Sequence, residues 1–220
     1  GSGRAQALAD ELGEVRVESL EELADRSDVV VLAVKPNALG EAGSALAGRV
    51  DGVVSVLGAT PLAALGDVLG ETPVLRTMPN LAVEVHRGVI CHTATEPTLG
   101  PALELLGALG TTVELAEDQL DAATAVMGCS PAYLARAVEA LIEAGVEAGL
   151  EPELSDMLAR EAAAGTGEHL LSREPREMQD AIASPDGSTE AGLEALEEAG
   201  GPDAFRAVVS ASLERMAGAR

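Results

Sequence analysis

Short apolar, β-branched runs alternate with helix-like segments through the first half of the chain, and this alternation constrains the fold more than any other feature. We expect strands over residues 28–34, 53–57, 72–76, 88–91 and 111–115. We expect helices before and between them, over residues 4–12, 18–25, 37–49, 61–69 and 97–109. Apolar strands separated by helices predict a mostly parallel sheet that is covered on both sides.

The strand signals stop near residue 116, and the second half reads as entirely helical. We expect helices over residues 118–127, 131–150, 154–172, 175–183, 189–199 and 202–219. The chain holds one Tyr, one Phe and no Trp, so the core of this half must be built from small aliphatic side chains. Such side chains bury little area each, and a subunit interface is therefore expected to supply further burial.

The α/β half opens on a helical pattern, although a dinucleotide-binding fold of this kind normally opens on a strand and a Gly-x-Gly-x-x-Gly turn. Gly1-Ser2-Gly3 does not match that turn. The expected missing unit is about 30 residues long, the size of one βαβ unit. Two interpretations of Gly1–Gly3 stay open: a remnant of cloning, or the native loop after a second strand.

Composition excludes several classes of function. Acidic residues outnumber basic ones 37 to 14, which gives a formal charge of −23. An acidic chain with almost no aromatic side chains is a poor binder of nucleic acid, and anionic membranes would repel it. The longest unbroken apolar run, Val29–Val34, is too short to span a bilayer, and no leader pattern opens the chain. The sequence therefore predicts a cytoplasmic protein that binds neither nucleic acid nor membrane.

Cysteine and histidine provide no metal or disulfide signal. Cys91 and Cys129 do not form a disulfide framework, and the three His residues stand in unrelated contexts. No metal site is expected. With no His near it in the sequence, Cys129 is interpreted as a small packed residue, with the role of a nucleophile as the less favoured alternative.

The chain's only Lys follows the first expected strand, in the segment Ala33-Val34-Lys35-Pro36-Asn37. In open α/β sheets, ligands bind just outside the carboxyl ends of the strands. Lys35 is thus a candidate ligand-binding residue. The alternative is that Pro36 only ends a strand and Lys35 is solvated.

A second segment, Arg76-Thr77-Met78-Pro79-Asn80, also stands at the carboxyl end of a strand. Pro79 stiffens the backbone, and the Asn80 amide can donate and accept hydrogen bonds, which suits an amide-bearing ring such as nicotinamide. The alternative, and in isolation the better one, is an ordinary Pro-Asn turn.

The third segment, residues 184–189 (Ser-Pro-Asp-Gly-Ser-Thr), precedes a helix. Small residues there expose backbone N–H groups at a helix N-terminus, where a carboxylate or phosphate can bind. The hydroxyls of Ser188 and Thr189 can add hydrogen bonds to such an anion. A plain N-cap is the alternative, and the charge of Asp186 argues against an anion.

Taken in order, these segments resemble the pyrroline-5-carboxylate reductase family, across essentially the whole chain. The motifs that carry the resemblance are Asp28–Pro36, Arg76–Asn80, Asp121–Ala125, Pro131–Tyr133, Ser184–Leu193, Glu197–Gly200 and the closing Ala-rich helix with Arg215.

The resemblance implies a fold class of α/β plus all-α. An incomplete Rossmann-like NADP-binding domain spans residues 1–116, without its first strand and Gly-rich turn, and a helical dimerisation and substrate domain spans residues 117–220. The implied activity is that of an oxidoreductase of amino-acid biosynthesis, namely NADPH-dependent reduction of 1-pyrroline-5-carboxylate to L-proline, the last step of proline biosynthesis. NADH stays open as the cofactor. The implied assembly is a homodimer through the helical domain, with a higher oligomer left open.

The resemblance also implies roles for individual residues. The residues that line the nicotinamide side are Ala33, Val34, Lys35, Pro36, Pro79 and Asn80. Ser2, Gly3 and Arg4 are candidates for the adenosine end with its 2′-phosphate. The residues that bind the substrate carboxylate are Ser184, Gly187, Ser188 and Thr189, and Thr189 also lies beside the ring nitrogen as the catalytic residue.

The sequence departs from the family's motifs at three places. The family's Ser-Gly-Ser-Gly-Pro-Ala is here residues 127–132, Met-Gly-Cys-Ser-Pro-Ala. Its Gly-Gly-Thr-Thr is here residues 186–189, Asp-Gly-Ser-Thr, and its Met-Pro-Asn-Thr-Pro is here residues 78–82, Met-Pro-Asn-Leu-Ala. Two alternatives therefore stay open: a related imine reductase of other specificity, and a non-catalytic dimerising relative.

Overall fold

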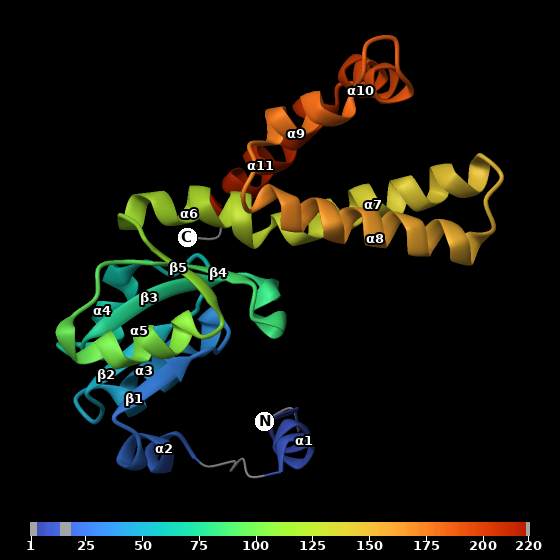
Figure 1. Ribbon diagram of the computed structural model, residues 1–220. Coiled ribbons are helices and arrows are strands. Elements are labelled where there is room, and N and C mark those ends of the chain that lie inside the picture. Colours follow the sequence, from blue (N-terminus) through green and yellow to red (C-terminus); the bar gives the residue numbers. More distant parts are fainter. Residues whose placement is uncertain (1–3, 14–18, 219–220) are drawn as a thin grey trace. The chain divides into compact units, whose positions relative to one another are not determined.

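The computed structural model describes residues 4–13 and 19–218 (Figure 1). The chain divides into two compact units. The first, which we call the α/β unit, comprises Gly1–Gly128 with Met216–Arg220, and the second, the helical unit, comprises Cys129–Arg215. Each unit is described by itself.

A five-stranded sheet forms the centre of the α/β unit, with its strands in the order of the sequence. The strands are β1 (Val29–Leu32), β2 (Gly52–Ser55), β3 (Val74–Pro79), β4 (Gly88–His92) and β5 (Gly110–Glu114). β1, β2 and β3 pair in parallel, β3 and β4 pair antiparallel, and β4 and β5 pair in parallel. The mostly parallel sheet expected from the alternating pattern is confirmed.

Helices cover the two faces of this sheet and leave part of its edge open. The covering helices are α2 (Leu20–Arg26), α3 (Leu39–Leu46), α4 (Leu62–Leu69) and α5 (Gly100–Gly107), and α1 (Arg4–Leu12) precedes them in the chain. Short 3-10 turns stand between them: η1 (Pro36–Ala38), η2 (Leu81–Val85), η3 (Pro97–Leu99) and η4 (Glu117–Gln119). Covering is incomplete at β1, because Val31 is 58% exposed on this edge strand.

Side-chain alternation along β2 sends its apolar residues into two separate cores. Val53 belongs to the larger core, with Val30, Leu32 and residues of α2, α3 and α4. Val54 points to the opposite face, where it packs with Leu75 and Leu99 and is flanked by residues of α5. Both faces of β2 are thus buried, because successive side chains of a strand point to opposite faces and helices cover each face here.

The helical segment that leaves the sheet is not a single α-helix. It runs from η4 through α6 (Leu120–Ala123) into a π-helix, η5 (Thr124–Gly128). The sequence predicts one regular helix over residues 118–127. Pro131 has no N–H to donate to the Met127 carbonyl, so regular α-helical bonding cannot continue from this segment into the helix that follows.

The helical unit contains five helices and almost no core of its own. The helices are α7 (Ser130–Glu147), α8 (Pro152–Leu170), α9 (Pro175–Ile182), α10 (Ser188–Glu198) and α11 (Gly201–Ala217) (Figure 1). Among its described residues, Ser155 alone is buried. The Ser155 hydroxyl donates to the Ile142 carbonyl at 2.8 Å and so ties α8 to α7. The structure therefore agrees with the expectation that this half buries few side chains by itself.

Large apolar side chains stand exposed along these helices. They include Leu134, Leu141, Val146, Leu154, Met157, Leu158, Leu171, Ile182, Leu196 and Phe205. The stretch Glu117–Glu147 is long and apolar enough to cross a membrane by length and composition alone. The same stretch carries the exposed charges of Arg136, Glu139 and Glu143, which are joined in ion pairs and which a bilayer interior would disfavour.

Candidate functional site

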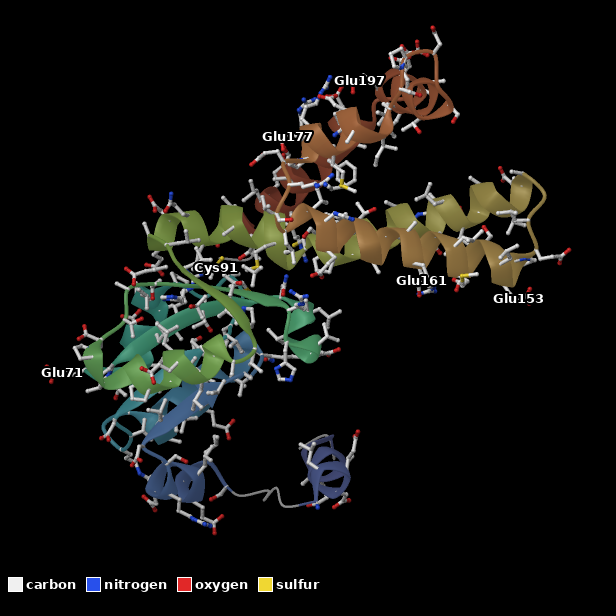
Figure 2. All side chains as sticks on the ribbon, in the orientation of Figure 1. Glu71, Cys91, Glu153, Glu161, Glu177 and Glu197 are labelled. Carbon is white, nitrogen blue, oxygen red and sulfur yellow. The ribbon has the colours of Figure 1, made fainter. Side chains whose placement is uncertain are left out.

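The carboxyl ends of β1, β2 and β3 meet at one edge of the sheet because these three strands are parallel. Chain segments that leave this edge hold the residues predicted from the Lys-Pro and Met-Pro-Asn motifs. Figure 2 shows all described side chains on the ribbon.

The segment after β1 is open to solvent at the predicted positions. Ala33 and Lys35 are exposed, Val34 is half-buried, and Pro36 begins η1. The Ala38 N–H donates to the Lys35 carbonyl at 2.9 Å, so the turn that presents Lys35 is closed by its own backbone. Lys35 therefore belongs to a hydrogen-bonded turn that follows the carboxyl end of β1, and its side chain is exposed.

The exits of β2 and β3 are neighbours at this edge. A Cβ on Gly58 would lie 4.0 Å from Cε of Met78. Pro79 is the last residue of β3, and both Pro79 and Asn80 are half-buried. Apart from its chain neighbours, no other atom of the described residues would lie within 4 Å of such a Cβ, so the space around Gly58 beside Met78 is open.

Asn80 is held on two sides. Its Oδ1 accepts the Val89 N–H at 3.1 Å, and its Nδ2 donates to the Met127 carbonyl at 3.2 Å. Its backbone N–H donates to the Val89 carbonyl, also at 3.1 Å. A side-chain amide has two donor hydrogens and two acceptor lone pairs, so one of each is left for another partner.

A buried arginine lies directly behind this edge. Arg76 is 1% exposed, and its Nη1 lies 2.9 Å from Oε1 of Glu117, while its Nη2 lies 3.8 Å from Oδ1 of Asp121. Oε1 of Glu117 also accepts the Leu62 N–H, at 2.5 Å. The ion pairs join β3 to η4 and α6, and they compensate a charge that would be costly to bury alone.

The sequence prediction did not include this cluster. The signal that would have indicated it is the single Arg within an apolar strand, since a buried guanidinium needs carboxylate partners. Those partners stand 41 and 45 positions further along the chain, so the sequence pattern does not select them from the chain's many other carboxylates.

The predicted substrate loop lies in the helical unit, between α9 and α10. The Gly187 N–H donates to the Ser184 carbonyl at 2.9 Å and closes the loop as a tight turn. A Cβ on Gly187 would lie 2.7 Å from the backbone carbonyl oxygen of Ser184, closer than real Cβ atoms approach, so this position favours glycine. Asp186 adopts a φ of 59°, in the left-handed region where residues other than Gly are uncommon.

The loop ends as the N-terminus of α10. Gly187 is the N-cap and has no side chain to accept a backbone hydrogen bond. The first-turn N–H groups, beginning at Ser188 and Thr189, therefore lack the side-chain cap that closes many helices. Ser188 is exposed, whereas Thr189 is half-buried. The geometry provides donors for a small anion.

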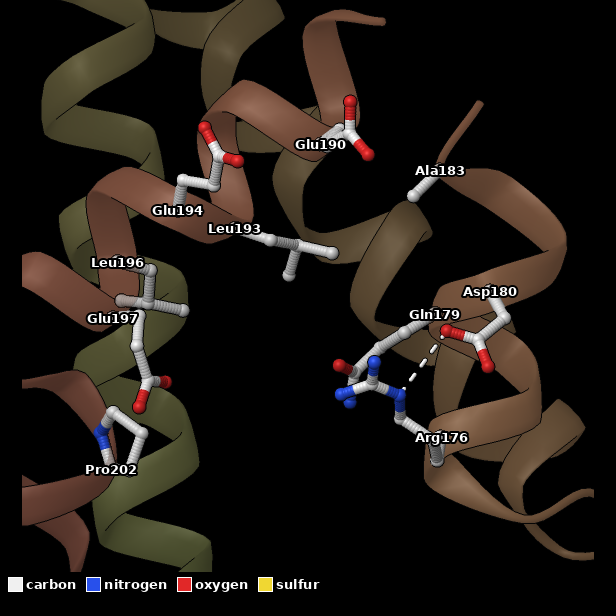
Figure 3. A pocket seen from close by; sticks show the side chains of 10 residues that line it. All are labelled: Arg176, Gln179, Asp180, Ala183, Glu190, Leu193, Glu194, Leu196, Glu197 and Pro202. Carbon is white, nitrogen blue, oxygen red and sulfur yellow. Dashed lines mark ion pairs between the residues drawn. The ribbon is translucent and has the colours of Figure 1, made fainter. Parts of the chain in front are cut away.

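Carboxylates stand close to these donors. Oε2 of Glu190 accepts the Asp186 N–H at 2.7 Å. A pocket of about 600 Å³ next to the loop is lined by residues of α9 and α10, including Arg176, Asp180, Glu190 and Glu194 (Figure 3). Arg176 pairs with Asp180 at 3.2 Å, so the net charge around the loop is negative.

Other sequence predictions stand as follows. Ser2 and Gly3 lie outside the described residues, and Arg4 is the first residue of α1. Cys91 is 4% exposed, and burial raises the pKa of its thiol, whereas Cys129 is half-buried. Within residues 4–13 and 19–218, no group of three His, Cys, Asp or Glu side chains is placed to hold a metal ion.

The structure thus brings the predicted nicotinamide-side residues together at one edge of the α/β unit. It brings Ser184, Gly187, Ser188 and Thr189 together in one turn of the helical unit.

Two family models match the chain. The model described as pyrroline-5-carboxylate reductase dimerisation matches residues 117–218. The model described as NADP oxidoreductase, coenzyme F420-dependent, matches residues 1–58.

Among curated proteins, the pyrroline-5-carboxylate reductase of Corynebacterium melassecola is 35% identical over 225 residues, which cover 96% of this chain and 83% of the relative. The enzyme of the same name from a Synechocystis strain is 35% identical and covers 89% and 76%, respectively.

Solved structures agree with these matches. The pyrroline carboxylate reductase of Plasmodium falciparum, crystallised with NADP bound, superposes with a TM-score of 0.81 at 29% identity and covers 91% of this chain and 80% of that one. The 1-pyrroline-5-carboxylate reductase of Streptococcus pyogenes gives a TM-score of 0.88 at 26% identity, with coverage of 98% and 86%. The fold class expected from the sequence is confirmed, and this chain belongs to the pyrroline-5-carboxylate reductase family.

Proposed function

We propose that the protein is an oxidoreductase that reduces 1-pyrroline-5-carboxylate to L-proline with NADPH, the last step of proline biosynthesis. The observation that carries this proposal is the match of 35% identity across 96% of the chain to an enzyme of that name. The related P. falciparum structure with NADP bound supports the choice of NADPH over NADH.

The residues at the sheet edge fit an anionic cofactor that bears an amide. Lys35 presents an exposed ammonium on a closed turn, Asn80 retains one donor and one acceptor, and Gly58 leaves space beside Met78. We assign Ala33, Val34, Lys35, Pro36, Pro79 and Asn80 to the nicotinamide side. We assign Ser2 and Arg4 to the adenosine end.

The turn before α10 fits the substrate carboxylate. Ser184 and Gly187 shape the turn, and the uncapped N–H groups of Ser188 and Thr189 provide the hydrogen bonds. The Thr189 hydroxyl is assigned to the ring nitrogen, where it donates a hydrogen bond or passes a proton.

Little acid–base machinery is needed, because a protonated cyclic imine is already electrophilic. The bound NADPH supplies a hydride. The protein's own residues hold two ligands in contact and exclude alternative poses, and such orientation contributes up to about 7–11 kcal/mol in ideal cases.

A homodimer through the helical domain is proposed as the working assembly, with a higher oligomer as the alternative. The dimerisation family model spans residues 117–218, the part of the chain that holds most of the exposed large apolar side chains. We propose a domain boundary at 116/117, where the dimerisation match begins; by their contacts, residues 117–128 belong to the α/β unit. A partner copy, not a lipid bilayer, is assigned to cover these helices. We also propose a cytoplasmic location, and the charge of −23 argues against a nucleic-acid partner.

The test measures oxidation of NADPH by the purified protein with pyrroline-5-carboxylate as substrate. The readout is the loss of NADPH absorbance. NADH and a pyrroline-2-carboxylate are run in parallel. Turnover with NADPH and pyrroline-5-carboxylate is expected. Turnover with the other imine alone would favour a reductase of different specificity, and no turnover by a folded dimer would favour a non-catalytic relative.

Two substitutions of Thr189 separate the chemical role of its hydroxyl from the contribution of the residue to α10. Thr189→Ala is expected to lower kcat by roughly 100-fold, the lower limit for loss of a proton donor. Thr189→Ser keeps the hydroxyl and is expected to recover most of the rate. Thr98→Ala, an exposed threonine in η3, is the matched control and should leave turnover unchanged.

A further inference from the structure

Helix α4 begins without a cap of its own. Pro61 stands at its N-cap position and offers no side-chain acceptor, and the first N–H groups of a helix have no carbonyl within the helix to bond. The Leu62 N–H instead donates to Oε1 of Glu117 at 2.5 Å. Glu117 stands 55 positions further along the chain, in η4, and so caps α4 from outside the helix. A carboxylate is favourable at this end, because the helix dipole is positive there.

A second donor fixes the same carboxylate oxygen. Nη1 of Arg76 lies 2.9 Å from Oε1 of Glu117, and Arg76 is almost fully buried on β3. Nη2 of Arg76 lies 3.8 Å from Oδ1 of Asp121, so the guanidinium has a carboxylate partner besides Glu117. α4 contacts β3, and both elements can be followed in Figure 1. One oxygen atom of η4 therefore bonds the start of α4 and the side chain of a β3 residue, and all of these residues belong to the α/β unit.

The loop that leads into α4, residues 56–61, leaves the carboxyl end of β2. In open α/β sheets, ligands bind just outside these strand ends. The sheet holds the upstream end of the loop, where the Val56 N–H donates to the Leu32 carbonyl at 3.1 Å. Gly58, in the middle of the loop, is the position at which the space beside Met78 is open. The loop therefore borders the edge that is proposed to bind the cofactor.

The conformation of this loop needs support at its downstream end. Ala59 adopts a φ of 54°, in the left-handed region where residues other than Gly are uncommon. Such a backbone conformation persists only where the surrounding structure enforces it. The Thr60 hydroxyl donates to the Gly58 carbonyl at 3.1 Å, but this hydrogen bond is internal to the loop. The bond from the Leu62 N–H to Glu117 ties the end of the loop to the rest of the unit.

We propose that Glu117 is a positioning residue, whose carboxylate caps α4 and thereby holds residues 56–61 in the conformation that accepts the cofactor. The inference rests on the proposed function, since it needs a dinucleotide at this edge. It does not involve the substrate loop or the helical unit.

The expected consequence of losing this cap is weaker cofactor binding with little change in the chemical step. Without the cap, the loop samples other conformations, and the apparent Kd rises in inverse proportion to the fraction of molecules that can bind. Once NADPH is bound, the loop is ordered again, so kcat at saturating NADPH should change little. A loss of fold alone would not produce this division between affinity and rate.

Glu117→Ala and Glu117→Gln test the cap. Glu117→Ala removes the acceptor, and we expect Kd and KM for NADPH to rise by roughly 3- to 30-fold, the range that loss of a helix cap supports, with kcat within about twofold. Glu117→Gln removes the charge but keeps an oxygen acceptor for the Leu62 N–H, so its Kd should stay close to that of the wild type. Titration calorimetry measures Kd without turnover. Amide hydrogen exchange without cofactor should be faster at Leu62 in Glu117→Ala alone.

Two controls match these variants. Glu104→Ala makes the same change on an exposed side chain of α5 and should leave Kd unchanged. Leu106→Ala, beside the core under α5, should lower the free energy of unfolding and also leave Kd unchanged. An unchanged Kd in folded Glu117→Ala would overturn the proposal. An equal rise of Kd in Glu117→Gln and Glu117→Ala would also overturn it, because the charge and not the cap would then be responsible.

A second pair of variants keeps the test valid if Glu117→Ala leaves Arg76 too poorly compensated to fold. Arg76→Met removes the buried charge and leaves the bond between Leu62 and Glu117 possible, and replacement of a buried ion pair by apolar side chains is often tolerated. Kd for NADPH should be higher in Arg76→Met/Glu117→Ala than in Arg76→Met. Equal Kd values in these two proteins would contradict the role of the cap.

The proposed function and this inference fail differently. A wild-type protein that neither binds nor oxidises NADPH contradicts the function. Wild-type binding and turnover that Glu117→Ala preserves at an unchanged Kd contradict only the role of Glu117.

Discussion

Asp186 lies in the loop that is proposed to bind the substrate carboxylate, and its own carboxylate carries the same negative charge. Its φ of 59° places it in the left-handed region at the turn before α10, and its N–H is bonded by the Glu190 carboxylate. The family's motif has Gly at this position. The substitution by Asp retains the turn, since Asp tolerates this conformation better than most residues do, but it adds a negative charge.

Removal of that charge is expected to strengthen substrate binding. Two unit charges about 4 Å apart interact by about 1 kcal/mol in water, so Asp186→Asn should lower KM for pyrroline-5-carboxylate by roughly two- to fivefold. Asn also tolerates the left-handed conformation, so the loop should keep its shape. Initial rates at a series of substrate concentrations provide the measurement.

Salt separates this effect from a change of fold. The decrease in KM caused by Asp186→Asn should become smaller as ionic strength rises, because salt screens exposed charges. Asp67→Asn, on the exposed side of α4, is the matched control and should show no change in KM. A KM that does not respond to Asp186→Asn at low salt would show that the substrate carboxylate binds elsewhere.

At the level of single residues, sequence could indicate short-range chemistry but not long-range pairing. Lys35, Asn80 and Thr189 lie within short motifs that can be recognised by Pro-Asn or Pro-Asp-Gly in consecutive positions. Arg76 and its partners Glu117 and Asp121 are joined only by the fold, across β3, η4 and α6.

Among the elements, α3 and α4 approach each other through a glycine. A Cβ on Gly43 would lie 2.7 Å from Cγ2 of Val68, closer than side chains tolerate. Gly40 stands one turn earlier on the exposed side of the same helix, and a Cβ there would meet nothing within 4 Å. The two positions therefore test packing and helix propensity separately.

Alanine at these two sites should change the free energy of unfolding in opposite directions. Gly43→Ala is expected to destabilise the protein by about 1–3 kcal/mol, because overpacking of a core forces neighbours to move. Gly40→Ala should stabilise it by about 0.5–1 kcal/mol, since glycine within a helix costs conformational entropy. Urea unfolding midpoints at unchanged slope measure both, and a stabilised Gly43→Ala would contradict the close α3–α4 approach.

Element order was predictable, but the irregular turns were not. Periodicity and β-branched runs located each strand and helix, because local pattern and tertiary burial agree in the α/β unit. In the π-helix η5, the Met127 carbonyl accepts a hydrogen bond from Asn80, and a side chain 47 residues away leaves no periodic signal.

For the whole molecule, the exposed apolar helices imply that assembly and stability are coupled. Ser155 is the single buried residue among those described in the helical unit, so that unit has little burial of its own to oppose conformational entropy. The unfolding temperature should therefore rise with protein concentration, as mass action requires for a folded dimer.

A charge placed on this surface should weaken the dimer. Leu141 is 63% exposed on α7, and Leu141→Glu is expected to cost about 2 kcal/mol or more of association free energy and to increase the monomer fraction in sedimentation. Leu105→Glu makes the same change at a leucine that is 75% exposed in α5 and should leave the dimer intact. A monomeric wild type that associates with neutral lipid vesicles would contradict this assignment.

The contact between Tyr133 on α7 and Ser212 on α11 has a spectroscopic consequence. The two hydroxyls are hydrogen-bonded, and Tyr133 lines an apolar hollow with Phe205. Since the sequence contains one tyrosine and no tryptophan, near-ultraviolet absorbance and intrinsic emission from the polypeptide arise essentially at that one phenol. The native protein thus carries a single-site optical reporter, without any label, of how α7 and α11 pack as the protein assembles or unfolds.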